Sequence, residues 1–248
     1  PWDRHQANYG TPEYVDYFHK QLTELMTNYG EVFEVWFDGA NGGDGWYGGA
    51  KDSRTIDRKT YYNYPRIYEI LDKLQPQAIV FSDGGPGCRW VGNENGFAGA
   101  TNWSFLRAGE VYPGYPKYRE LQYGHANGNQ WVPAECDVSI RPGWFYHREE
   151  DDKVKSLSTL VDIYFKSVGY NSVLLLNIPP DTRGLIHEND AKRLQELAQY
   201  ISHTFATDYG KTSHEKITGK KGTGRHLIRN FHAEIWILGE STCPIKTE

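Results

Sequence analysis

The sequence predicts an α/β protein built around a parallel sheet. Two observations predict it: segments with helical spacing of apolar residues alternate with short apolar runs, and each apolar run stops at turn-forming residues. The chain has 248 residues and a formal net charge of -5 at pH 7. That length is enough for one barrel-sized domain or for two small domains.

The first expected helix begins at Thr11, an N-cap residue followed by a proline at the first helical position. Apolar residues recur at helical spacing after it, and Gly30 ends the run. The first expected strand lies within residues 32–38, because this β-prone run stops at the turn-forming pair Asp38-Gly39. A helix and a strand therefore open the chain in the order of an α/β fold.

The same alternation continues through the rest of the chain. Residues 83–130 are rich in Gly, Asn, Tyr and Pro, and a loop this long is expected to be functional. The remaining expected elements are a helix over 61–74, strands over 78–81 and 131–135, a helix over 151–168, a strand over 172–177 and a helix from about 188 to 201.

The number of elements limits the architecture. Four strands and about four helices are half of what a complete (β/α)₈ barrel requires. Residues 205–248 offer one weak strand, over 233–238, and a basic, glycine-containing stretch. We therefore expect a partial α/β domain over residues 1–204 and a tail or remnant over 205–248.

Composition excludes several classes of protein. Scattered Lys and Arg residues without a basic stripe argue against nucleic-acid binding, and no run of about 20 apolar residues predicts a membrane span. Three cysteines, Cys88, Cys136 and Cys243, allow at most one intrachain disulfide and form no CxxC metal motif. We recognise no signal peptide, so localisation is an inference from function.

Two carboxylates follow successive expected strands. Asp38 ends the first, and Glu94 lies in the loop after the second, each near a tryptophan. Because catalytic groups of parallel sheets sit at the carboxyl ends of the strands, this pair suits glycoside hydrolysis. One carboxylate attacks the anomeric carbon, and the other protonates the leaving oxygen. The alternative is that Asp38 only caps its strand. Aromatic residues, 15% of the chain, suit sugar platforms but also fill cores.

Four long motifs carry a resemblance to a known family. They resemble those of the α-L-fucosidases of glycoside hydrolase family 29, and the second and third are similar to the subgroup that prefers α-1,3- or α-1,4-linked fucose. The motifs are Trp-Phe-Asp-Gly-Ala-Asn (36–41), Arg-Trp-Val-Gly-Asn-Glu-Asn-Gly (89–96), Ser-Ile-Arg-Pro-Gly-Trp-Phe-Tyr (139–146) and Ser-Val-Gly-Tyr-Asn-Ser-Val-Leu-Leu-Leu-Asn-Ile-Pro-Pro-Asp (167–181).

The resemblance implies a retaining glycosidase that releases terminal α-L-fucose from oligosaccharides and uses neither a cofactor nor a metal. Asp38 matches the nucleophile, and Glu94 matches the general acid/base. Retention requires their carboxyl groups to lie about 5 Å apart. A fucosylated oligosaccharide would be the substrate, and the family implies an extracellular or periplasmic location.

The resemblance also implies sugar contacts. Trp144 would pack on the C5 methyl group of fucose, with a core position as the alternative. Arg89 would bind a hydroxyl or carboxylate in the pocket, or else an ion pair would hold its own loop. Asn177 and Asp181 are expected to be structural. The full set of predicted substrate-binding residues is Trp2, Arg89, Trp90, Trp103, Glu135, Asp137 and Trp144.

Departures from the family are equally clear. The family begins with three more strands, whose histidine motifs grip the fucose hydroxyls, and it ends with a β-sandwich. Neither histidine motif occurs in these 248 residues. The expected fold is an incomplete, TIM-type (β/α)₈ barrel without a full C-terminal β-sandwich. We expect self-association into a homo-oligomer to cover its open edges, with the 205–248 tail folding over an edge as the alternative. The alternatives to an active hydrolase are a vestigial glycan-binding protein and a fragment of a longer fucosidase.

Overall fold

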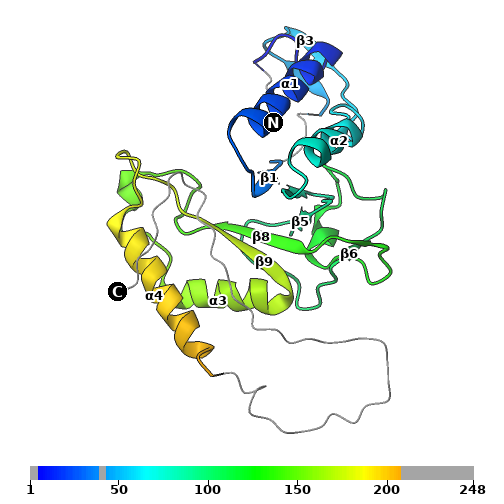
Figure 1. The fold of residues 1–248 in the computed structure, drawn as a ribbon. Helices are drawn as coiled ribbons and strands as arrows, with labels where there is room; N and C mark the ends of the chain where they lie inside the picture. The colour runs from blue at the N-terminus through cyan, green and yellow to red at the C-terminus, as the bar shows by residue number, and fades with distance from the viewer. Residues whose placement is uncertain (1–4, 39–42, 208–248) are drawn as a thin grey trace, which may run out of the picture. The chain divides into compact units, whose positions relative to one another are not determined.

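The computed structural model describes residues 5–38 and 43–207 (Figure 1). Trp2, Cys243 and the weak strand expected over 233–238 lie outside these residues. The chain divides into two compact units, which we describe separately. The first unit holds residues up to 137 together with 165–174, and the second holds 138–164 together with the residues from 175 onward.

A parallel sheet forms the centre of the first unit, as the sequence predicts. Its strand order is β1-β4-β5-β8-β9, and the pairs β1–β4, β4–β5 and β5–β8 are parallel. Two short antiparallel ribbons, β2–β3 and β6–β7, lie in the connections. The strands are β1 (Glu34–Trp36), β2 (Gly45–Tyr47), β3 (Asp52–Arg54), β4 (Ile79–Ser82), β5 (Cys88–Trp90), β6 (Phe105–Leu106), β7 (Gln130–Trp131), β8 (Ala134–Ser139) and β9 (Ser172–Asn177).

Four α-helices are found in the described residues: α1 (Pro12–Asn28), α2 (Tyr64–Leu74), α3 (Leu157–Ser167) and α4 (Glu188–Thr204). Three short 3₁₀-helices span Tyr118–Gln122, Arg148–Glu150 and Val168–Tyr170. Within this part of the chain, no helix has the length and apolar character that a membrane crossing requires.

Two expected boundaries were wrong. The helix expected from 151 begins only at Leu157, and before it the Lys155 ammonium binds the carbonyl oxygens of Ser139 and Arg141 at 2.6 and 3.0 Å. The strand expected over 131–135 is β8, which begins at Ala134 and continues to Ser139 with every residue buried.

Strand β5 was not predicted, since it lies in the segment expected to be a loop. It is three residues long and has a charged residue, Arg89, at its centre. The structure buries this guanidinium fully and binds it to backbone carbonyls. Burial of a charge with complete hydrogen bonding is a tertiary property that a local apolar pattern does not reveal.

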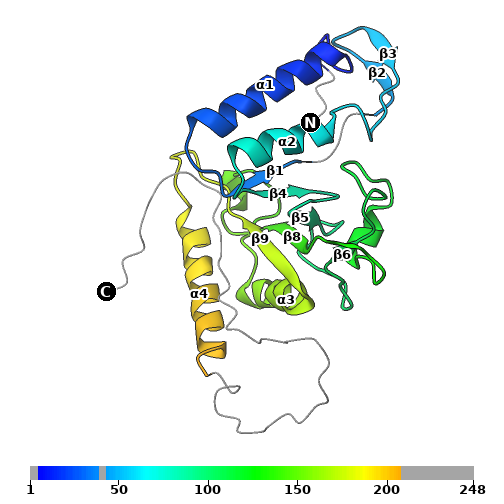
Figure 2. The ribbon, with the colours of Figure 1, turned by 45° about the vertical axis from the view of Figure 1, so that its right-hand side comes forward.

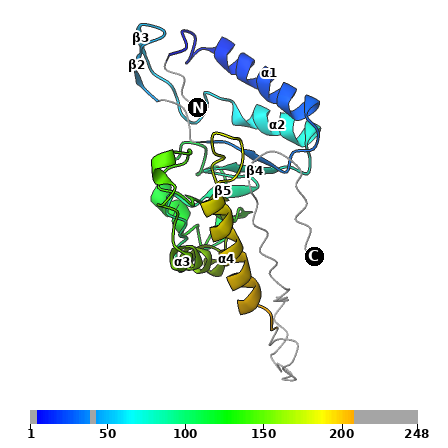
Figure 3. The same cartoon turned by 90° about the vertical axis from the view of Figure 1, so that its left-hand side faces the viewer.

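Helices α1 and α2 lie side by side over one face of the sheet, as Figures 2 and 3 show from two directions. Val35 of β1 and Val80 of β4 point to this outer face, where they pack with Leu22, Ile67 and other apolar residues of the two helices. Burial of these apolar side chains is the main force that holds the helices on the sheet.

The opposite, inner face of the sheet curls strongly. Strands β1 and β8 are separated by two other strands, which in a flat sheet would place them about 14 Å apart. Yet the Trp36 indole nitrogen lies 3.1 Å from a carboxyl oxygen of Glu135. The sheet therefore curls so that the inner-face side chains of β1 and β8 point toward each other, as in one half of a barrel.

Candidate active site

The inner face of the sheet carries the predicted catalytic carboxylates at its carboxyl end. Residues alternate between the faces of β1, so Glu34 and Trp36 share the inner face and Asp38 follows with the same parity. On the neighbouring strands, Trp90 and Glu135 are register partners and occupy the same face. Asp38 and Glu94 are both solvent-exposed, as groups that meet a substrate must be.

Asp137 of β8 links the two predicted catalytic carboxylates. Its carboxyl group is only 2% exposed, and burial together with the negative charges of Glu94 and Asp38 raises its pKa to about 7. A hydrogen bond from the Trp90 indole, 2.9 Å long, partly offsets this rise. Both charges therefore act on the same buried carboxyl group.

A further buried carboxyl, Asp83, belongs to the same neighbourhood, although the sequence analysis did not predict it. Burial raises its pKa, and the charge of Asp38 adds to the rise. The Gly114 amide donates a 2.6 Å hydrogen bond to it, which ties the long loop to the end of β4. The turn-forming residues that follow the strand were a signal that could have identified this position.

Glu135 and Trp36 form a second layer below the predicted catalytic pair. Burial and the neighbouring Glu34 raise the pKa of Glu135 to about 8. The atoms of Glu34, Cys88 and Glu135 that could ligate a metal ion, two carboxylate oxygens and one sulfur, lie within 4.8 Å of one another. Hydrogen bonds among these groups account for that spacing, so we do not assign them as metal ligands. The alternation of residues between the two faces of β1 could have shown from the sequence that Glu34 and Trp36 share the face of Asp38.

Arg89 faces away from this site. As the neighbour of inner-facing Trp90 it lies on the outer face of β5, and it is fully buried. Its guanidinium donates to the carbonyl oxygens of Leu121 (2.9 Å), Trp103 (3.0 Å) and Val132, and to the side chain of Asn102 (2.7 Å). Arg89 therefore holds its own loop. Its partners are carbonyl and amide oxygens, whereas the ion pair expected from the sequence would need a carboxylate.

Trp103 accompanies Arg89 on the outer side of the sheet. Its carbonyl oxygen accepts from the guanidinium, and its own amide donates to Tyr123 at 2.8 Å. The side chain is 47% exposed. The structure thus brings Trp90, Glu135 and Asp137 to the inner face, and it places Arg89 and the Trp103 backbone with the supporting loop.

Trp144 belongs to the second unit, in the loop that follows β8. The side chain is half-buried, and its carbonyl oxygen accepts a 3.0 Å hydrogen bond from the Asn177 amide. Fully buried Arg141 fixes the same loop by binding Asp190 at 2.8 Å and Asp151 at 3.0 Å. The local sequence pattern does not reveal this anchor, because the fully buried partner, Asp190, lies 49 residues away in the chain.

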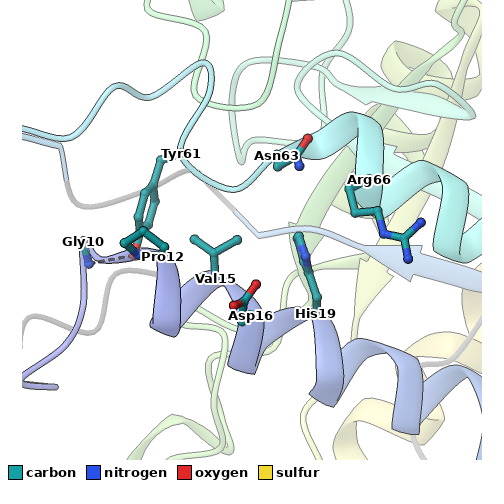
Figure 4. A pocket seen from close by; sticks show the side chains of 8 residues that line it. All are labelled: Gly10, Pro12, Val15, Asp16, His19, Tyr61, Asn63 and Arg66. Carbon is teal, nitrogen blue, oxygen red and sulfur yellow. Dashed lines mark hydrogen bonds between the residues drawn. The ribbon is translucent and has the colours of Figure 1, made fainter.

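A groove of about 540 Å³ lies between α1 and α2 on the first unit (Figure 4). Two of its polar side chains are already engaged: the His19 ring is hydrogen-bonded to Tyr62, and Arg66 pairs with Glu69 at 2.8 Å. None of the predicted site residues lines it. We therefore locate the candidate active site at the inner face of the sheet.

Comparison with known proteins identifies the family. A family model described as alpha-L-fucosidase matches residues 2–204. The chain belongs to the alpha-L-fucosidase family. The match covers the sheet and all four helices, which are the elements that position the carboxylates.

Individual relatives of this fucosidase-family chain agree. It is 43% identical to alpha-L-fucosidase 1 of Arabidopsis thaliana over 217 residues, which are 85% of the chain and 39% of the relative. A glycoside hydrolase 29 family member from an unknown rumen bacterium superposes with a TM-score of 0.75 at 50% identity, over 88% of the chain and 39% of that protein.

A third relative was solved with a sugar bound. The Ruminococcus gnavus GH29 fucosidase in complex with fucose superposes with a TM-score of 0.65 at 27% identity, over 84% of the chain and 44% of that protein. The chain thus spans well under half the length of each of these three relatives.

Proposed function

We propose that the chain carries the catalytic carboxylates of a retaining exo-glycosidase that hydrolyses terminal α-L-fucosyl linkages in oligosaccharides and glycoconjugates. The observation that carries the proposal is that charges on Asp38 and Glu94 both act on buried Asp137 at the inner face of the sheet. Family membership supports the substrate class. The relatives quoted above are glycoside hydrolases, which favours hydrolysis over glycan binding alone.

In the proposed mechanism, a carboxylate oxygen of Asp38 attacks the anomeric carbon while the glycosidic bond breaks. The leaving oxygen takes the proton of Glu94, and a fucosyl ester remains on Asp38. Glu94 then removes a proton from water, whose oxygen attacks the same carbon and releases fucose and free Asp38.

The finer specificity rests on the predicted sugar contacts. We propose a preference for α-1,3 and α-1,4 linkages, with Trp144 against the C5 methyl group of fucose and with Trp2, Trp90, Glu135 and Asp137 around the pocket. α-L-Galactosides carry a hydroxymethyl group at that position, so Trp144→Ala should erase much of the preference for fucosides over them. Unchanged discrimination in the variant would assign Trp144 to a purely structural role.

The experiment that tests the proposal uses two substrates of different leaving-group ability. Asp38→Asn should lower kcat by about three orders of magnitude or more on both an activated aryl fucoside and a fucosyl oligosaccharide, since it removes the nucleophile. Glu94→Gln should impair the oligosaccharide far more, because only its leaving group requires protonation. Equal losses on both substrates would remove Glu94 from the acid role, and the absence of turnover in the unaltered chain would overturn the proposal.

We further propose that the chain self-associates. Strands β1 and β9 occupy the two edges of the described sheet, and a partner strand would satisfy the backbone groups along such edges. Size-exclusion chromatography with light scattering should therefore give a homo-oligomer whose activity falls on dilution. A stable, non-aggregating monomer would contradict this proposal.

A further inference from the structure

Two carboxyl groups meet on the inner face below the catalytic pair. Glu34 of β1 and Glu135 of β8 hydrogen-bond to each other through their side chains. The Cys88 thiol of β5 lies between them and donates toward both, with sulfur–oxygen distances of 3.6 and 3.7 Å. Three strands of the curled sheet thus contribute one group each to a single cluster.

This cluster requires a proton. Two ionised carboxylates in contact repel each other strongly, and a hydrogen bond between them exists only if one is protonated. Glu135 is 4% exposed and Glu34 is half-buried, so water screens the two charges only in part. The groups that shift the two carboxyls most are each other, Cys88 and Trp36, and none of these is a cation.

The cluster is connected to the catalytic strand by Trp36. The Trp36 indole donates to Glu135 at 3.1 Å, and its ring stacks on Phe81 with a centroid distance of 4.2 Å and an interplanar angle of 6°. Trp36 precedes Asp38 by two residues on the same chain segment. The indole contacts therefore act on the chain segment that carries Asp38.

We propose that Glu34 and Glu135 share one proton and act together as positioning residues that, through Trp36, hold the end of β1 and with it Asp38. This rests on the proposed function only in naming Asp38 as the nucleophile. Loss of the shared proton leaves two facing negative charges, which push the carboxyl groups apart and displace the indole that donates to Glu135.

The variants can be chosen so that the hydrogen bond from Trp36 survives while the group can no longer ionise. Glu135→Gln keeps an oxygen that accepts from Trp36 and gains an amide that donates to Glu34, but it cannot ionise. Glu34→Gln tests the other partner in the same way. Asp137→Asn is the matched control, because it lies on the same strand and face but holds Trp90 in place of Trp36.

The decisive measurement is the fluorine NMR signal of Trp36 in protein labelled with 5-fluorotryptophan, assigned by its disappearance in Trp36→Phe. We expect this signal to shift with pH with a midpoint near 8, the pKa to which burial and Glu34 raise Glu135. In Glu135→Gln the signal should stay constant, whereas Asp137→Asn should retain the titration. A Trp36 signal that does not titrate in the unaltered protein, or that titrates equally in Glu135→Gln, overturns the proposal.

An activity profile gives a second readout that is independent of the first. The kcat for an aryl fucoside should fall above about pH 8 in the unaltered protein, and this alkaline fall should be absent in Glu135→Gln. A chain without turnover contradicts the proposed function, while the NMR titration still decides the present proposal. Stoichiometric zinc in the purified protein would also overturn it, since a cation would hold both carboxylates ionised.

Discussion

Buried carboxyl groups in the two units differ in the kind of partner they have. In the first unit, Glu135 and Asp137 are 4% and 2% exposed, and each accepts from a neutral tryptophan indole. In the second unit, Asp190 is fully buried and binds the Arg141 guanidinium at 2.8 Å, and Asp181 binds Arg183 at 2.6 Å. These buried carboxyl groups thus accept hydrogen bonds from neutral donors in the first unit and from cations in the second.

The difference decides which groups can hold a proton near neutral pH. An indole only partly offsets the cost of burying a charge, so the pKa values of Glu135 and Asp137 rise to about 8 and about 7. Hydrogen bonds from Arg183 instead lower the pKa of Asp181 to about 2. Carboxyls with neutral partners are thus suited to proton chemistry, and those with cationic partners are suited to structure.

The largest effect is expected where the cation is removed from the second unit. Arg141→Met should lower the free energy of unfolding by about 3–5 kcal/mol, because it leaves the Asp190 carboxylate buried without its partner. Urea denaturation followed by circular dichroism measures the change. The double variant Arg141→Met/Asp190→Leu is the control and should recover most of the loss. If Arg141→Met were as stable as the unaltered protein, the cation would not be needed to hold the buried Asp190 carboxylate.

An intermediate effect is expected in the pH dependence of stability, with opposite signs in the two units. The folded protein holds a proton on Asp137 up to about pH 7, whereas the unfolded chain loses it near pH 4, so stability should fall between these values by at most about 4 kcal/mol. The lowered pKa of Asp181 has the reverse consequence, and its contribution should be lost as the pH falls from about 4 toward 2.

Matched variants separate the two slopes. In urea midpoints measured across pH, Asp137→Asn should flatten the decline between about pH 4 and 7, and Asp181→Asn should flatten only the acidic decline. If both variants altered the same part of the profile, the partner would not determine the direction of the pKa shift.

The smallest effect is expected for an ion pair on the surface. Arg66 and Glu69 are 58% and 66% exposed, and their contact at 2.8 Å is as short as that of Arg141 with Asp190. Because water screens the exposed pair, Arg66→Ala should cost less than about 1 kcal/mol. A loss as large as that of Arg141→Met in the same urea experiment would show that burial does not govern the strength of these pairs.

Long periodic segments were predictable from the sequence, and short ones were not. Helices α1, α2 and α4 and strand β9 lie close to their expected positions, because their apolar spacing and terminal residues encode them locally. Strand β5 was missed, since burial of Arg89 among distant carbonyl groups stabilises it. The β8 boundary was misplaced because Asp137 looks polar in sequence and is buried in the fold.

By itself, the sequence determined the alternation of helices and strands and the family, because these depend on local patterns and on motifs. It also predicts Asp38 and Glu94 as the catalytic carboxylates, although Glu94 follows β5 and not the strand expected over 78–81. Only the tertiary structure decided that Arg89 supports a loop and that Glu34 reaches Glu135 across the curled sheet. Curvature brings side chains of non-adjacent strands into contact, and burial then sets which carboxyls keep their protons. Neither effect can be read from neighbouring residues in the chain.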